Sequence, residues 1–267
     1  MTAIATGTED LLTTFREGVL TVCFNRPTRR NAMTGELELA YLTLLKRAER
    51  ESSVRAVVVT GAGGAFCSGA DLSALQAATE NPVTPGDPHS DPTFPLSFRK
   101  PLIAAVDGPC IGLGFAEALF CDVRFASTEA KFSTAFARRG LIAEYGLSWL
   151  LPQVIGRAHA LDLLMTGRTI AADEAERIGL VRQVTSSEDV VAAAHAYAVE
   201  VAQFSSPTSI AVIKEQINAD AGRDMDGAVT DAFRLMAESF ERPDLIEGVT
   251  AHFEKRPPLF ANWNADS

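Results

Sequence analysis

The sequence has few cysteines, no excess of basic residues and no long apolar run, and each absence removes a class of protein. Its four cysteines (Cys23, Cys67, Cys110 and Cys121) have neither C-x-x-C nor metal-ligand spacing, which indicates reduced, buried thiols. A net charge of −10 disfavours a nucleic-acid surface, so an anionic ligand would need a local basic patch. No apolar run reaches membrane-spanning length and residues 1–17 contain no signal-peptide core, which predicts a cytoplasmic protein with no membrane partner.

What the chain does have is length and an ordinary composition. Its 267 residues suffice for one large domain, or for a domain with a small appendage, around a sizeable core. Hydrophobic residues make up 47% and charged residues 22%, as is usual in globular proteins. We therefore expect a globular fold.

The most informative stretch is residues 101–122, in which a short apolar run meets a glycine-rich turn. Leu102–Val106 is short enough for a buried strand, and turn residues at 107–109 end it. Gly112 and Gly114 then lead into an apolar helix. A strand, a glycine turn and a helix start leave unpaired N–H groups that can hold a phosphate, a carboxylate or an oxyanion. The alternative is a turn whose glycines only let a helix pack closely on a sheet.

The same order of elements occurs earlier in the chain. A buried strand over residues 55–60 runs into residues 61–72, which are again rich in glycine. Two such turns can bring two N–H donors to one point, which is what an oxyanion hole requires. A dinucleotide site is not supported, because the third position of a G-x-G-x-x-G pattern is Glu117 and no clear acidic ribose ligand follows.

An arginine-containing loop and an amphipathic helix lie between the first strands. Arg26, Arg29 and Arg30 cluster in the loop, and such a cluster is by itself typical of a solvated loop. Thr34 is suited to cap the N-terminus of a helix that ends near Glu51. The apolar face of this helix contains Leu37, Tyr41, Leu44, Leu45 and Ala48.

Several motifs in a consistent order resemble the crotonase (enoyl-CoA hydratase/isomerase) superfamily. The resemblance covers roughly residues 10–260. It rests on Asn25-Arg26-Pro27, Asn31-Ala32-Met33, the segment from Ala65 to Leu72, Asp107-Gly108 leading to Cys121-Asp122, Leu164 to Arg168, Ala172 to Glu176, Gly179-Leu180-Val181 and Phe253 to Arg256. It is specific for the superfamily but not for the reaction, because this fold supports many reactions on one thioester site.

The resemblance implies an α/β fold, a crotonase-like spiral of ββα turns over residues 1–203, followed by a helical oligomerisation region over 204–267. It also implies a homotrimer or a dimer of trimers. Independently, amphipathic patterns predict four helices at the end of the chain: Val190 to Phe204, Ser206 to Ala219, Asp226 to Phe240 and Arg242 to Glu254. Helices that follow a compact α/β body need an apolar surface to cover, and a neighbouring subunit can provide it.

The resemblance also implies a set of site residues. The backbone N–H groups of Ala70 and Leu113 correspond to the oxyanion hole that holds the thioester oxygen. Coenzyme A, which enters as part of the substrate and not as a separate cofactor, is expected to contact Arg30, Arg26, Ala65, Cys67, Ser68 and Lys255. No metal is expected. The donors matter because an enolate forms at the thioester when an α-proton leaves or when water adds to the β-carbon.

The sequence departs from the family at both glutamates that hydratases use. Their positions correspond to Ala116 and Phe136. Glu117 lies one residue late, and one residue turns a side chain by about 100° around a helix. We therefore interpret Glu117 as a misplaced or structural carboxylate.

One acid remains in a mostly apolar stretch, Glu144. Its position resembles that of the Asp or Glu that acts as base or nucleophile in dienoyl-CoA isomerases and in a dehalogenase branch of the superfamily. An apolar pocket raises a carboxyl pKa and suits the group to move a proton near neutral pH. The structural alternative is an acid favoured by the dipole of the helix that starts at Leu147. Pairing with Arg138 or Arg139 would weaken the argument for a raised pKa.

Residues 77–98 form a proline-rich insertion, which is typical of a lid, a binding loop or a locally disordered segment, and we expect it to border the acyl pocket. His89 within it is more typical of a solvated loop residue than of a catalytic base. The preferred function is isomerisation of an enoyl- or dienoyl-CoA double bond with Glu144 as proton shuttle. The alternatives are an enoyl-CoA hydratase and an acyl-CoA-binding protein without catalysis.

Overall fold

A six-stranded sheet carries the body of the computed structural model, which describes residues 4–71, 76 and 91–263. The strand order is β1-β2-β3-β4-β6-β9; β1 and β2 are antiparallel, and the other neighbours are parallel. These strands span Leu11–Arg16 (β1), Val19–Phe24 (β2), Ala56–Gly61 (β3), Leu102–Val106 (β4), Val123–Ser127 (β6) and Gln183–Thr185 (β9). A three-stranded sheet joins Pro109–Ile111 (β5), Lys131–Ser133 (β7) and Ile170–Ala171 (β8).

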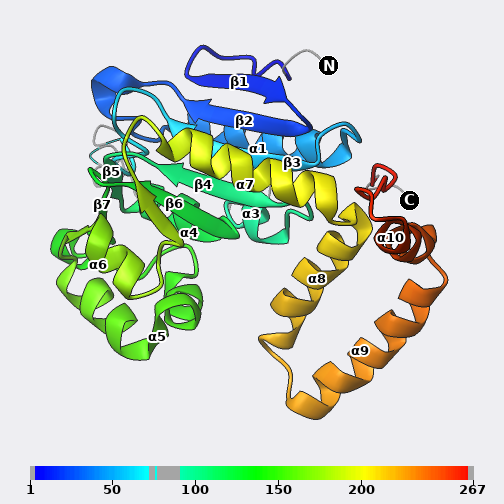
Figure 1. Cartoon of the computed structure of the whole chain (residues 1–267). Helices are drawn as coiled ribbons and strands as arrows, with labels where there is room; N and C mark the ends of the chain where they lie inside the picture. Colours follow the sequence, from blue (N-terminus) through cyan, green and yellow to red (C-terminus); the bar gives the residue numbers. More distant parts are fainter. Residues whose placement is uncertain (1–3, 72–75, 77–90, 264–267) are drawn as a thin grey trace.

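Helices cover both faces of the main sheet, which explains why its central strands are uninterrupted apolar runs. Helix α7 (Val190–Phe204) lies along one face, as Figure 1 shows, and packs there against side chains such as Val58 and Phe125. The opposite face belongs to the main hydrophobic core. Helices α1 (Gly35–Arg50), α4 (Leu113–Phe120) and α5 (Leu147–Thr166) contribute to that core.

Helix α1 confirms the boundaries predicted from the sequence. The Thr34 hydroxyl accepts a hydrogen bond from the backbone N–H of Leu37 at 3.2 Å, so the helix begins where the capping residue predicts. Its buried side chains are Leu37, Tyr41, Leu42, Leu44, Leu45 and Ala48. The face that anchors α1 is therefore the predicted one.

Shorter elements connect these parts. Helix α5 starts at Leu147, as predicted, and is interrupted by a non-helical residue, Gly156. The other short helices are Pro27–Arg29 (η1), Phe94–Ser97 (α3), Ala137–Arg139 (η2) and Ala172–Arg177 (α6). The insertion is described only from residue 91 onward, where α3 lies, and His89 is outside the described residues.

Three helices at the end of the chain project away from the sheet (Figure 1). They are α8 (Pro207–Asp220), α9 (Met225–Phe240) and α10 (Pro243–Glu254), close to the predicted positions. Many of their apolar side chains are exposed: Ile213, Ile217, Val229, Phe233, Met236, Phe240, Ile246, Val249 and Phe253. Within residues 4–71, 76 and 91–263, no helix has the length and apolar character needed to cross a membrane.

Candidate active site

A cavity of about 550 Å³ lies between the two glycine-rich turns, and its volume is typical of a small-molecule site. It brings together five of the predicted site residues: Arg30, Ser68, Ala70, Leu113 and Glu144. The remaining lining residues are Arg29, Ala32, Gly69, Asp71, Gly112, Phe136, Arg139, Leu141 and Tyr145.

Asn31 fastens the arginine-containing loop to the first turn. Its side chain is fully buried; Oδ1 accepts the Arg26 N–H at 2.8 Å, and Nδ2 donates to the carbonyls of Ala62 at 2.9 Å and Ala65 at 2.6 Å. Arg30 and Asn31 both have positive φ angles, 50° and 56°, which asparagine tolerates better than most residues. Sequence reasoning used Asn31 only as part of a motif and missed this function.

Ala70 presents an unpaired backbone donor to the cavity. Met33 donates to the Gly69 carbonyl at 2.8 Å and accepts from the Asp71 N–H at 2.8 Å, so the groups on either side of Ala70 pair with Met33. Successive groups of an extended strand point to opposite sides, so the N–H of Ala70 points away from Met33. It has no acceptor within the described residues.

Leu113 presents the second donor because it is the first residue of α4. The first N–H groups of a helix have no intrahelical acceptor. Gly112, with φ 56°, donates to the Ser133 carbonyl at 2.9 Å, and the first helical bond runs from Ala116 N–H to the Gly112 carbonyl at 3.0 Å. The N–H of Leu113 is left without an acceptor in the part of the chain that the structure describes.

Two glycines let these turns pack backbone against backbone. A Cβ added to Gly69 would lie 2.9 Å from the Ile111 carbonyl oxygen and 3.8 Å from the Leu113 nitrogen. A Cβ added to Gly114 would overlap the carbonyl oxygen of Cys67. A larger side chain at either position would therefore separate the turns that carry the two donors. The arrangement has the donors needed to hold one developing oxyanion.

Glu144 is a half-buried carboxyl group in the cavity wall, and burial raises its pKa above the usual value for glutamate. Among residues 4–71, 76 and 91–263, no ion pair involves Glu144. Arg138 instead donates from Nε to the Thr166 carbonyl at 2.7 Å, and Arg139 lines the cavity. Glu144 therefore has no ion-pair partner among the described residues that would lower its pKa, and a raised pKa suits it to accept a proton.

Three arginines, Arg29, Arg30 and Arg139, give the cavity the local basic patch that an anionic ligand requires in an acidic chain. Arg26 is placed differently. It donates to the Ala32 carbonyl and forms ion pairs with Asp71 at 3.2 Å and Asp10 at 3.4 Å, and it does not line the cavity. These contacts hold the loop in shape.

The other predicted contacts for coenzyme A lie outside the cavity lining. Ala65 and Cys67 are buried beneath it; the Ala65 carbonyl accepts from Asn31, and the Cys67 carbonyl accepts from the Ile111 N–H at 2.9 Å. Lys255 is an exposed residue that ends α10, on the far side of the chain from α5 in Figure 1. A binding function for these three residues stays a prediction.

The two positions that hold glutamate in hydratases carry apolar side chains. Phe136 forms part of the cavity wall, and Ala116 is fully buried behind it. Glu117 is also fully buried and does not line the cavity. Burial, and then the nearby charge of Glu38, raise the pKa of Glu117 well above its usual value. The cavity wall thus contains one carboxyl with a raised pKa, that of Glu144, while Glu117 is a second such group outside the lining.

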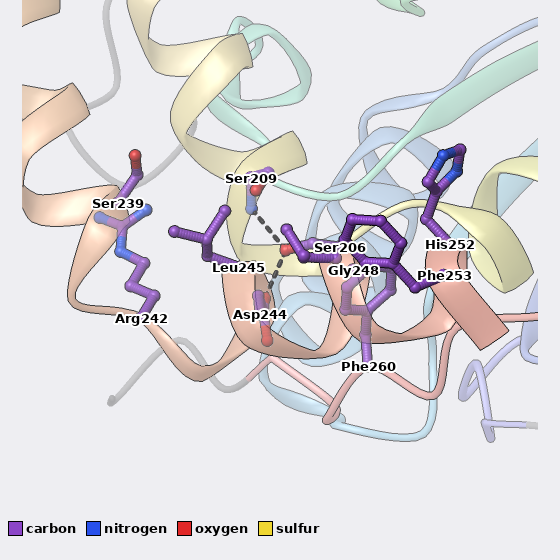
Figure 2. Close-up of a pocket in the computed structure, with 11 residues that line it drawn as sticks. Ser206, Ser209, Ser239, Arg242, Asp244, Leu245, Gly248, His252, Phe253 and Phe260 are labelled. Atoms are coloured by element: carbon purple, nitrogen blue, oxygen red, sulfur yellow. Dashed lines mark hydrogen bonds between the residues drawn. The ribbon is translucent and has the colours of Figure 1, made fainter.

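A larger cavity of about 680 Å³ lies elsewhere, between α8 and α10 (Figure 2). Two of its polar side chains, Ser206 and Asp244, are partners of one another. The Ser206 hydroxyl accepts from the Ser209 N–H at 3.0 Å and donates to the Asp244 carboxylate, and so caps the N-terminus of α8. Leu245, Phe253 and Phe260 make the rest of this groove apolar (Figure 2).

The sheet, the helices at the end of the chain and the two glycine-rich turns that pack against each other define a protein with the crotonase fold. Residues 14–263 match the family model described as Enoyl-CoA hydratase/isomerase. This chain is 35% identical over 268 residues to a 1,2-epoxyphenylacetyl-CoA isomerase of Escherichia coli K12, covering 94% of this chain and 98% of that protein.

Solved structures agree with this assignment. An enoyl-CoA hydratase from Polaromonas sp. JS666 superimposes with a TM-score of 0.87 at 30% identity, over 94% of this chain and 99% of that one. An enoyl-CoA hydratase from Mycobacterium tuberculosis H37Rv gives 0.85 at 29% identity, over 95% and 99%. The chain belongs to the enoyl-CoA hydratase/isomerase family.

Proposed function

We propose that this family member moves the double bond of an enoyl- or dienoyl-CoA, with Glu144 as the group that carries the proton. The N–H groups of Ala70 and Leu113 hold the thioester oxygen. Glu144 removes a proton from one carbon and returns it to another, and the enolate formed between the two steps is stabilised by the donors. No water is consumed in this reaction.

Coenzyme A is held, on this proposal, at the basic edge of the cavity. Arg29 and Arg30 meet its phosphate groups, and Ser68 lies beside them. Arg26, Ala65 and Cys67 support the same wall, with backbone groups rather than side chains at the last two positions. Lys255 reaches coenzyme A only if α10 of a neighbouring subunit approaches the cavity.

One observation carries the choice of reaction: Glu144 is the carboxyl group with a raised pKa in the cavity wall, while Ala116 and Phe136 replace the two hydratase glutamates. Shuttling one proton between two carbons needs one carboxylate, whereas activating and splitting water is better served by two. The similarity to the Escherichia coli isomerase supports the same reading. The names of the Polaromonas and Mycobacterium structures make hydration the second candidate.

Product analysis separates these candidates. The parent protein is incubated with a 3-enoyl-CoA and, separately, with a 2-enoyl-CoA, and the products are followed by mass spectrometry and proton NMR. We expect conversion of the 3-enoyl-CoA into the 2-enoyl isomer with no change in mass. Addition of one water to the 2-enoyl-CoA would instead identify a hydratase. Tight binding of both thioesters without turnover would identify a non-catalytic acyl-CoA-binding protein.

We also propose that the chain assembles as a homotrimer or a dimer of trimers. The proposal is supported by the apolar side chains that α8, α9 and α10 expose, because contiguous apolar surface on a globular protein marks an interaction site.

A further inference from the structure

Glu117 and Tyr41 are buried polar residues that the proposed reaction does not use. Both side chains are fully buried, and neither the two carboxyl oxygens of Glu117 nor the Tyr41 hydroxyl has a hydrogen-bond partner in the described part of the chain. Most buried polar groups in proteins are paired, and leaving one unpaired is costly. This pair therefore points to a partner that arrives from outside the chain.

Burial, and then the charge of Glu38, raise the pKa of Glu117 well above the usual value for glutamate, which favours its protonated form. A neutral carboxyl group offers one O–H donor and retains acceptor oxygens, and a phenol hydroxyl can donate and accept. The chemistry matched to this pair is an uncharged oxygen function such as a hydroxyl or a carbonyl. An acyl group that carries a carboxylate would be rejected, because the carboxylate would lose its hydration and lie near the like charge of Glu38.

The position of Glu117 relates it to the oxyanion hole. Leu113 and Glu117 are four residues apart on α4 and so lie on one face of the helix. A separation of four residues is about 6 Å along a helix axis. If the thioester is held at the Leu113 N–H and the acyl group runs along α4, the acyl group reaches Glu117 after about one helical turn.

Tyr145 is a cavity-lining residue whose electrostatic surroundings include Glu117. It lines the cavity, and its φ angle of 54° is unusual for a bulky residue. Burial, and then the charges of Glu38, Glu144 and Glu117, raise the pKa of Tyr145 to about 12. The same side chain therefore faces the cavity and lies within electrostatic reach of Glu117.

We propose that Glu117 and Tyr41 form a neutral hydrogen-bonding subsite for a hydroxyl or carbonyl oxygen on the acyl group of the substrate, reached when Tyr145 turns aside. The proposal rests on the proposed acyl-CoA function and names the substrate class: acyl groups with an uncharged oxygen function about one helical turn from the thioester. A site built around buried polar groups discriminates against an analogue that leaves them unpaired.

Binding of non-reacting thioesters tests the subsite without relying on turnover. Calorimetric titration compares hexanoyl-CoA with 6-hydroxyhexanoyl-CoA on the parent and on two variants. Glu117→Gln keeps one donor and one acceptor, whereas Glu117→Leu removes both at similar volume. We expect the parent and Glu117→Gln to prefer the hydroxylated thioester by about tenfold, and Glu117→Leu to lose that preference.

Denaturant unfolding of each variant accompanies the titrations. We expect Glu117→Leu to be at least as stable as the parent, because it removes an unpaired buried carboxyl, so its lost preference cannot come from unfolding. Equal affinity of the parent for the two thioesters would overturn the subsite and leave an internal water as the partner of Glu117.

Two further outcomes would also overturn it. If Glu117→Gln abolishes turnover of every enoyl-CoA while the parent shows no preference for the hydroxyl group, Glu117 is a proton-transfer residue. If the parent binds neither thioester, the proposed acyl-CoA function fails and the subsite fails with it. The first result leaves the acyl-CoA function intact, so the two failures are distinguishable.

Discussion

Helix α4 is apolar by sequence and α9 is amphipathic; every residue of α4 is buried and none of α9 is. Helix α4 contacts β5, α3 and α5, and its Gly114 packs against Cys67 of the first glycine turn, so the donor at its N-terminus and the carboxyl of Glu117 are set within one subunit. Helix α9 presents Phe233, Met236 and Phe240 to the outside. Within the described residues, one subunit thus forms the candidate cavity with its two N–H donors, whereas the apolar side chains of α9 are left exposed.

A large effect on turnover is expected from a change at the start of α4. Leu113→Pro removes the N–H donor while remaining compatible with the first position of a helix. Turnover should fall by about 10²–10³-fold, because one oxyanion donor is lost, while affinity for coenzyme A changes little. Leu113→Ala, which keeps the N–H, is the matched control for steady-state kinetics. Unchanged turnover in a folded Leu113→Pro protein would place the oxyanion hole elsewhere.

Assembly is the property that α9 should control. Phe233→Asp puts a charge on its exposed apolar face, where the folded subunit loses no buried contact. We expect sedimentation to shift from a trimer or hexamer toward the monomer, while the unfolding free energy of the subunit changes by less than about 0.5 kcal/mol. A parent that sediments as a monomer at micromolar concentration would contradict the proposed function of the helical end.

A buried carboxyl on α4 also predicts a dependence of stability on pH. The pKa of Glu117 is higher in the folded state than in the unfolded state. At a pH between these two pKa values, the carboxyl is protonated in the folded state and ionised in the unfolded state. Stability therefore falls as pH rises above the unfolded pKa, by up to about 1.4 kcal/mol per pH unit from this group. Glu117→Gln removes this contribution, so its stability relative to the parent should increase with pH.

Urea unfolding between about pH 4.5 and pH 7 measures that difference. The exposed Glu241, which follows α9, provides the control, because Glu241→Gln removes a solvated carboxyl. A constant difference between Glu117→Gln and the parent across this range would mean that Glu117 is charged and paired in solution.

The smallest effect is expected in the pH dependence of the reaction. Glu144 must be ionised to accept a proton, and its pKa is raised by burial. The value of kcat/KM should therefore decline as pH falls through a pKa above the usual glutamate value of about 4.3. Glu144→Asp should keep an acid limb with a lower rate. An acid limb that is identical in Glu144→Gln would assign the ionisation to another group.

Local sequence patterns predicted much of this fold and part of the site. The Thr34 cap, the apolar run of β4, the glycine turns and the helical end are encoded within short segments, and the structure has them at the predicted places. The clustering of Ala70, Leu113 and Glu144 around one cavity followed from the family resemblance, which carries the spatial information that local patterns lack.

The missed features depend on contacts between distant segments. Asn31 bonds to carbonyls more than thirty positions away, and nothing in its neighbours along the chain indicates those partners. Glu117 was interpreted as a misplaced or structural carboxylate, and it lies fully buried in α4, but the sequence did not indicate that its carboxyl oxygens lack a partner among the described residues. Arg26 was predicted, like Arg30, to contact coenzyme A. Its ion pairs with Asp10 and Asp71 instead stabilise the conformation of the loop.

The proton-shuttle function of Glu144 is the central claim, and solvent deuterium exchange tests it most directly. In deuterated buffer the parent should exchange the α- or γ-proton of an enoyl-CoA while it isomerises the double bond. Glu144→Gln should lower both rates by about 10²–10⁴-fold with little change in thioester affinity, and Glu117→Gln should leave both nearly intact. Full exchange in Glu144→Gln, or the reverse ranking of the two variants, would contradict the account.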